Sequence, residues 1–401
     1  MKMAKKIGLL IAFCLSQLCI QCSSDDNKSI EEKVITEQET NEITLLRNYI
    51  AESLHIDIIK VIYDADKSIF IIDRDILMPL EHAIGNFNRS NSIITNKKNQ
   101  MGGVYMIKPE MAKSIKVYIS PDVPAVWKNS INQAIKNWNS INTSINLAIV
   151  DSPTSANTTI VMYEEPLGVI ATAYMPYDGK PGESIKINSK YNNLIESKKV
   201  CTITHEFGHT FGLDHTNSDN RRIECTPILD DDSVMTTPVF EFVKLSPYDI
   251  IAISQLYPVA AGTKKLYRYK KKQYYFYTTD PCEIIPGKDG YVLDGDSGYL
   301  YLTQVDGTVP LYRSLNGPSI KDHKLSIAQT STSDVIIGYL YSTQQPGTTA
   351  LYSSIASYEY FPSNKHYLYT TIFNKDEVIM SPMGYVPNKI IQNYNPNDII
   401  F

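Results

Sequence analysis

The segment HEFGHTFGLDH, residues 205 to 215, constrains the local fold more than any other stretch of the chain. His205 and His209 are four residues apart, so on an α-helix both side chains project from one face, with Glu206 beside them. Gly212 lacks a Cβ and favours the left-handed conformation that ends a helix. The sequence therefore predicts a helix that stops at Gly212 and a turn that brings His215 back towards the other two histidines.

These three histidines form a candidate metal site. Three neutral imidazoles around Zn²⁺ leave a fourth coordination position for water, which is typical of catalytic rather than structural zinc. We therefore expect one catalytic Zn²⁺ ion on His205, His209 and His215. An alternative stays open, because Cys201 lies four residues before His205 on the same helical face. A set made of Cys201, His205 and His209 would indicate a structural site.

The same residues carry a resemblance to a known family. HEFGHTFGLDH fits the HExxHxxGxxH pattern of the metzincin zinc proteases at every specified position, and DSVMTTP is similar to their Met-turn. With TPILDDDSVM and LSPYDIIAISQLYP, residues 105 to 260 resemble the bacterial dual-action HEIGH metallopeptidases. The resemblance implies zinc on the three histidines, Glu206 as the general base, and Met235 as the structural floor beneath the metal.

The residues before the motif predict short strands and one amphipathic helix. Trp127, Ile131, Ala134 and Trp138 recur at helical spacing and form one apolar face. Strand patterns stand before and after this helix, at SIKVYIS, NLAIVD, TTIVMYEE, VIATAY and SIKINS. We expect an α+β fold in which residues 105–260 form a metzincin-like zinc metallopeptidase domain, with a twisted mixed sheet and two long helices.

The N-terminus has the pattern of an export signal. Lysines precede an apolar run from Ile7 to Ile20, which is too short for a preferred membrane span. Residues 1–21 resemble a bacterial lipoprotein signal peptide, with Cys22 as the lipidated residue. The acidic stretch after Cys22 resembles the surface-export signal of Bacteroidota lipoproteins. We therefore expect an exported lipoprotein of the outer membrane that is exposed at the cell surface and held in the membrane by its lipid.

Two further segments separate this signal from the peptidase domain. Residues 22–42 are polar and acidic without an apolar period, which predicts a flexible tether. Residues 43–104 form an N-terminal segment that is either a pro-like region or an accessory layer. The formal net charge is −5 and becomes more negative once the signal is removed, which makes nucleic acid an unsuitable partner.

The last part of the chain, residues 262–401, repeats itself. YLYLTQVDGTVPLY at 299–312 returns as YLYSTQQPGTTALY at 339–352. Three such units of roughly forty residues predict an all-β pseudo-threefold repeat domain, β-trefoil-like or a small propeller-like arrangement. Tyr267, Tyr312 and Tyr352 recur with the repeat, and we expect them to pack the pseudo-axis. The module is similar to tyrosine-rich repeat domains of secreted bacterial hydrolases, and its ligand would be a glycan or a protein.

Three cysteines remain after the signal and Cys22. In an oxidising compartment Cys201 and Cys225 could form a disulfide around the histidine motif and leave Cys282 unpaired, or both could stay buried thiols.

Together these patterns predict a monomeric zinc-dependent endopeptidase that acts on a protein or peptide substrate. The alternative is a glycan- or protein-binding adhesin built on an inactive protease-like scaffold.

Overall fold

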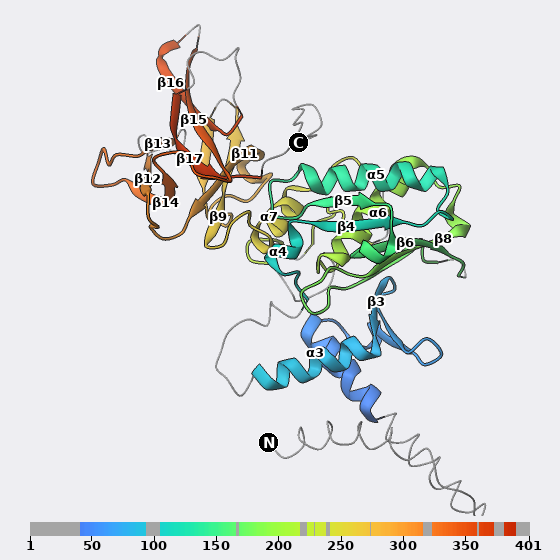
Figure 1. Cartoon of the computed structure of the whole chain (residues 1–401). Coiled ribbons are helices and arrows are strands. Elements are labelled where there is room, and N and C mark those ends of the chain that lie inside the picture. The colour runs from blue at the N-terminus through green and yellow to red at the C-terminus, as the bar shows by residue number, and fades with distance from the viewer. Residues whose placement is uncertain are drawn as a thin grey trace, which may run out of the picture. The chain divides into compact units, whose positions relative to one another are not determined.

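The computed structural model describes residues 41–93, 105–165, 168–216, 223–227, 229–237, 241–272, 274–315, 323–358, 361–372 and 381–389. The chain divides into two compact units, Met1–Tyr105 and Met106–Phe401. The predicted signal peptide, Cys22 and nearly all of the predicted tether lie outside the described residues (Figure 1). Within the described ranges, no helix has both the length and the apolar content to cross a membrane.

The N-terminal unit has its own small core. Residues 41–54 are helical and bury Leu46, Ile50 and Leu54. Three antiparallel strands follow in a meander, and then one helix: β1 Val61–Asp64, β2 Ile69–Ile72, β3 Ile76–Pro79 and α3 Leu80–Ile93.

In the second unit, a mixed five-stranded sheet carries the histidine helix. Within this unit the strand order is β7-β8-β6-β4-β5, with the first pair antiparallel and the others parallel. The sheet and the short helix before it comprise α4 Pro109–Ala112, β4 Ile115–Ile119, β5 Leu147–Val150, β6 Thr158–Tyr163, β7 Ala171–Tyr174 and β8 Ser184–Asn188. The predicted mixed sheet is confirmed.

Two long helices pack together beside this sheet (Figure 1). They are α5 Ala125–Ser140 and α6 Glu196–Thr210. The apolar face predicted for the first helix is buried, since the four residues that define it are fully inaccessible to solvent. The Trp138 indole N–H donates to the Thr204 carbonyl at 2.9 Å, which fixes α5 against the turn of α6 just before the motif.

The helix that follows the histidine region has a well-defined N-terminal cap. It is α7, Pro247–Leu256, and it begins with a capping box in which Ser246 and Asp249 each accept a hydrogen bond from the other's backbone N–H. Pro247 occupies the first helical position, where a backbone N–H is not needed.

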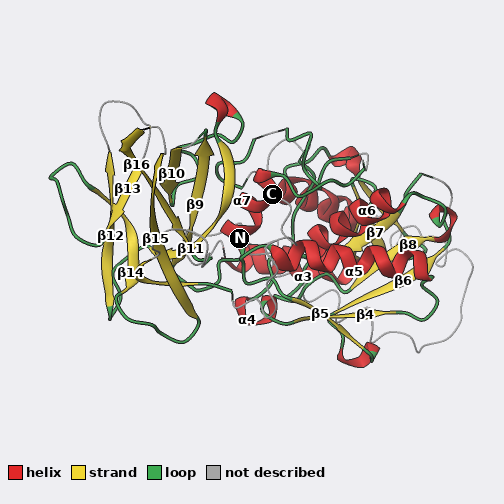
Figure 2. Cartoon of the chain, turned by 90° about the horizontal axis from the view of Figure 1, so that it is seen from above, coloured by secondary structure: helices red, strands yellow, loops and turns green. Residues whose placement is uncertain are grey.

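The remaining strands form a separate all-β region (Figure 2), and the described residues between them include a short 3₁₀ turn at Lys288–Gly290. They form one branched antiparallel sheet. Each of the three units contributes three strands in turn: β9 Thr263–Lys271, β10 Tyr274–Thr278 and β11 Val292–Tyr301; β12 Thr308–Leu315, β13 His323–Ser326 and β14 Val335–Tyr341; β15 Thr348–Tyr358, β16 Phe361–Thr370 and β17 Ser381–Pro387.

The first strand of every unit begins at the same kind of turn. Gly262, Gly307 and Gly347 all adopt left-handed φ values between 72° and 78°. The threonine after each glycine donates its hydroxyl to the carbonyl three residues earlier, at 2.7, 2.6 and 2.6 Å. Each glycine carbonyl accepts a hydrogen bond from the backbone N–H of the first residue after the unit's third strand. The turns therefore repeat in hydrogen bonding as well as in sequence.

A second set of glycines closes the three units into a ring. A Cβ on Gly338 would meet Leu300 of the first unit, one on Gly384 would meet Leu340 of the second, and one on Gly298 would meet Val386 of the third. In every unit, a glycine thus lies close to an apolar residue of another unit. The three contacts run in a cycle through the three units, as a threefold arrangement requires. The β-trefoil assignment itself stays a prediction.

The residues that line the module's core differ from those expected. The buried cluster contains Leu266, Leu311 and Leu351, each one position before the predicted tyrosine. Tyr312 and Tyr352 are only half-buried. Because successive side chains of a strand point to opposite faces, a shift of one residue takes these tyrosines out of the shared leucine core. Tyr267 is buried instead in a separate cluster with Tyr269, Phe276 and Tyr291. The expectation that these tyrosines pack the axis was wrong.

The predicted Cys201–Cys225 disulfide is also wrong. Cys225 pairs with Cys282, 57 residues later, and this bond joins the segment after the histidine motif to the loop after β10. Cys201 is a buried thiol in the apolar core beneath α6. The helix directs Cys201 into the apolar core, whereas Cys225 is bonded to Cys282, so closeness in sequence was misleading.

The end of α5 and the loop that follows it hold the module against the part of the chain that contains α5 and α6. The Asn142 carbonyl accepts hydrogen bonds from Lys265 Nζ at 3.3 Å and from Tyr299 Oη at 2.7 Å. Lys389, just past β17, donates its ammonium to the carbonyls of Asn139 and Ile145. Burial lowers the pKa of Lys389 to about 8. Both ends of the module therefore bind one short loop through backbone carbonyls.

Candidate metal centre

Helix α6 places the first two histidines one turn apart. The Nε2 atoms of His205 and His209 are 2.9 Å from each other, and both side chains are fully buried. Ile203, Phe207 and Phe211 occupy another face of the helix and join the apolar core. The helix is thus anchored by its apolar residues, and its histidines face a common point.

The turn after α6 supplies the third imidazole. Gly212 has φ of 90°, as the sequence predicted, and its N–H donates to the His209 carbonyl at 2.9 Å. Leu213 N–H donates to the Gly208 carbonyl at 3.0 Å. The chain then reverses, and His215 Nε2 lies 3.2 Å from the Nε2 atoms of both other histidines.

Two backbone carbonyls determine which ring nitrogens face the common point. His205 Nδ1 lies 2.8 Å from the Val234 carbonyl, and His209 Nδ1 lies 2.9 Å from the Leu213 carbonyl. A carbonyl only accepts, so each Nδ1 carries the proton and each Nε2 presents a lone pair. Lone pairs that converge in this way repel one another unless a cation lies between them.

The donor set fits zinc. A tetrahedral zinc site holds nitrogens about 2 Å from the metal, which puts them roughly 3.3 Å from one another. The observed separations of 2.9 to 3.2 Å are close to this value. Histidines held by Nδ1–H bonds to carbonyls also have the outer-shell support found at protein metal sites. Cys201 is not among the groups gathered at the cluster, so His215 is the third nitrogen donor.

Glu206 follows His205 on α6 and is only 2 % exposed. The structure brings the three predicted histidines together. Glu206 as the general base stays a prediction from the motif.

Met235 lies beneath this helix and explains a glycine that sequence reasoning missed. A Cβ on Gly208 would overlap the Met235 sulfur, so the residue between the two histidines must be glycine for the methionine to approach. Met235 is buried, and its carbonyl accepts from Thr216 N–H at 3.2 Å. The methionine thus contacts the helix at Gly208, just before His209, and the backbone of Thr216, just after His215.

A buried aspartate holds the turn that contains Met235. Asp249 accepts from Ser233 Oγ at 2.6 Å and from the backbone N–H of Val234 at 2.9 Å. Burial raises the pKa of the Asp249 carboxyl to about 6, although these hydrogen bonds favour its ionised form. Because the Val234 carbonyl binds His205, Asp249 supports the orientation of a metal-site histidine through the backbone of one residue.

Three convergent imidazoles with a buried glutamate on the same helix define a metallopeptidase-type centre. Residues 94–234 match the family model described as "Dual-action HEIGH metallo-peptidase", which confirms the resemblance for this part of the chain. Residues 248–336 match a model described as "Domain of unknown function (DUF5648)". No curated protein matches the sequence.

Two solved structures are similar to part of the chain. One is titled "Structure of Myroilysin"; it has 16 % identity and a TM-score of 0.29, and the match covers 41 % of this chain and 87 % of the other. The second is titled "Crystal structure of myroilysin", with 16 % identity, a TM-score of 0.28, and coverage of 40 % and 93 %.

Proposed function

We propose that this protein is a zinc-dependent endopeptidase, with zinc held by His205, His209 and His215. The observation that carries the proposal is the convergence of three Nε2 lone pairs on one point, with two of the rings held in that orientation by backbone carbonyls. When bound, zinc supplies Lewis-acid polarisation of a carbonyl and lowers the pKa of water towards neutrality.

The residues of the chain have separate tasks in this proposal. Glu206 acts as the general base, taking a proton from the attacking water and later giving it to the leaving amine. The Val234 and Leu213 carbonyls keep His205 and His209 in the required tautomer. Met235 and Asp249 support the helix and the turn from below, so the site is rigid before substrate arrives.

Export, anchoring and the module's role are further parts of the proposal. We infer from the N-terminal pattern that the protein is a surface lipoprotein anchored through Cys22. Its substrates would be proteins or peptides outside the cell, and the module would bind a protein or glycan near them. Mass analysis of membrane-extracted protein would find diacylglycerol on Cys22; an unmodified N-terminus would contradict the anchor.

The activity is tested with zinc content and a single substitution. Purified protein should contain one zinc per chain and cleave a fluorescent casein substrate, with activity lost to a chelator and restored by zinc. Glu206→Gln should keep zinc and lose about a hundredfold or more of the rate. Glu110→Gln, an exposed glutamate on α4, is the matched control. Zinc binding with no cleavage of any protein would favour the adhesin alternative.

A further inference from the structure

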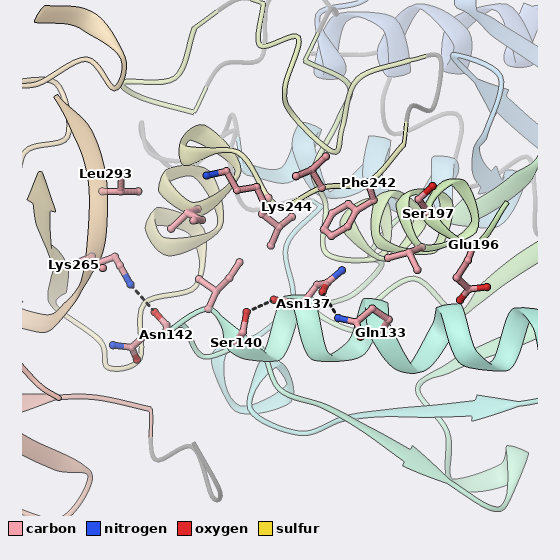
Figure 3. Close-up of a pocket in the computed structure, with 16 residues that line it drawn as sticks. Gln133, Asn137, Ser140, Asn142, Glu196, Ser197, Phe242, Lys244, Lys265 and Leu293 are labelled. Carbon is pink, nitrogen blue, oxygen red and sulfur yellow. Dashed lines mark hydrogen bonds between the residues drawn. The ribbon is translucent and has the colours of Figure 1, made fainter. Parts of the chain in front are cut away.

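A second site lies away from the histidines. A pocket of about 390 Å³ opens between α5, the first turn of α6, residues 242–250 and the strands β9 and β11 (Figure 3). This volume lies within the range of small-ligand sites. None of its lining residues belongs to the histidine cluster. Its apolar wall is formed by Ile141, Val200, Phe242, Leu245, Ile250 and Leu293.

The charges of the pocket are segregated. Figure 3 places Glu196 at one end, and Lys244 and Lys265 towards the other. Ser130 Oγ donates to Glu196 Oε1 at 2.8 Å, which fixes the carboxylate while Oε2 remains for a ligand. Lys265 is buried and already donates to Asn142, whereas Lys244 is exposed at the mouth. A ligand with a positive and a negative end would match this arrangement.

Two amide side chains lie between these ends. Gln133 Nε2 donates to Asn137 Oδ1 at 2.9 Å, and Asn137 Nδ2 donates to Thr204 Oγ1 at 3.2 Å. These hydrogen bonds orient both amides and leave Gln133 Oε1 as an acceptor. Such amides suit the N–H groups of a polypeptide backbone.

One apolar side chain of the pocket is exposed. Val243, which lines it, is 71 % exposed, next to the buried and half-buried apolar side chains of the wall. An apolar lining with a few polar groups is typical of a ligand site. The ligand should therefore carry apolar side chains between its two charged ends.

We propose that this pocket binds a short apolar peptide with free termini. Its ammonium pairs with Glu196, its carboxylate pairs with Lys244, and its side chains fill the apolar wall between them. A peptide is the ligand class that combines a zwitterionic span, backbone amides and apolar side chains. Binding here does not depend on hydrolysis at the histidine centre, so failure of either proposal leaves the other standing.

Calorimetric titration of the full-length protein with the tripeptide Leu-Ala-Leu tests the proposal. The protein carries Glu206→Gln so that the peptide stays intact. Saturable binding at millimolar concentration is expected. Blocking the ammonium by acetylation, or the carboxylate by amidation, should each weaken binding about fivefold, the size expected of one solvent-accessible ion pair.

Substitutions locate the bound peptide. Lys244→Gln should lower the affinity for the unblocked peptide about fivefold, and amidation of the peptide should then have no further effect. Glu196→Gln should lower this affinity by a similar factor, and acetylation of the peptide should then have no further effect. Lys198→Gln, a neighbour on α6 that does not line the pocket, is the control and should change nothing.

Three results would overturn the assignment. They are absence of saturation, equal affinity for the free and doubly blocked peptides, and equal effects of Lys244→Gln and Lys198→Gln.

Discussion

The Tyr257 hydroxyl donates a hydrogen bond to the Phe211 carbonyl at 2.5 Å, at the point where α6 ends. The same hydroxyl accepts from Ile107 N–H at 3.1 Å. Tyr257 is the residue that caps the C-terminal end of α7. Its hydroxyl therefore links the end of α7 and the backbone of Ile107 to the turn that carries His215.

Replacing this tyrosine should weaken the peptidase part. Tyr257→Phe leaves a buried carbonyl and a buried N–H without their shared partner, which should lower the free energy of unfolding by about 2 kcal/mol. Urea denaturation measures the loss. Tyr301→Phe, at a half-buried tyrosine of the module, should stay within about 0.5 kcal/mol of the parent. Similar losses in both variants would contradict the assigned role of Tyr257.

Removing the Asp249 carboxylate should loosen His205. Asp249→Ala leaves the donors of Ser233, Val234 and Ser246 buried, and should cost about 3 kcal/mol of stability. Zinc affinity, measured by competition with a chelating dye, should fall at least about tenfold. Asp249→Asn keeps one oxygen as an acceptor for the backbone N–H groups, so its losses of stability and zinc affinity should be smaller. The exposed Asp231→Ala is the control, and an unchanged zinc affinity in Asp249→Ala would refute the link.

The glycine between the two helix histidines should tolerate no side chain while Met235 is present. Gly208→Ala introduces a Cβ that overlaps the methionine sulfur, and should cost about 2 kcal/mol through overpacking. Met235→Ala alone should also destabilise, because it empties a buried site. In the double variant the two losses should not add, because truncation makes room for the new methyl. Strict additivity in thermal melts would disprove the contact.

The module should lose stability in acid through His323. This imidazole is buried against Phe276, and burial, with Arg313 nearby, lowers its pKa from 6.5 to about 4. The unfolded state then binds more protons between these values, so stability is fully present above pH 6.5 and is lost as pH falls through 4. The loss is at most about 3 kcal/mol. His323→Leu should flatten this dependence, and an equally steep profile in that variant would point to another group.

The disulfide has a consequence for thermal stability. Cys225→Ser with Cys282→Ser removes a link across 57 residues, which should cost about 4 kcal/mol in the chain-entropy model. Peptide mapping without reduction should recover the Cys225–Cys282 pair. Recovery of a peptide containing Cys201 in that pair would restore the original sequence-based pairing.

Local spacing predicted much of the site. The four-residue interval fixed the orientation of His205 and His209, and the missing Cβ of Gly212 accounts for the left-handed turn that delivers His215. The buried face of α5 followed from periodicity alone. These features depend on residues within one or two helical turns of each other, where backbone geometry decides the outcome.

The features that were missed depend on contacts between distant residues. Asp249 binds Val234 fifteen residues earlier, and Tyr257 binds Phe211 forty-six residues earlier. Neither pairing has a periodic signature, since loops of unspecified path lie between. The module's axis was misjudged by a single residue because a strand offers two faces and leucine and tyrosine alternate along it.

The contact between Gly298 and Val386 has a consequence for biosynthesis. The first unit of the module needs a partner that the ribosome delivers nearly ninety residues later. Before the third unit has been synthesised, the leucines that later form the common core stay exposed on the nascent chain. Residues 105–260 have already been translated at that stage. A chaperone or the translocation machinery would have to shield this interval, and a premature stop within the third unit would release an aggregation-prone chain rather than a shorter, working one.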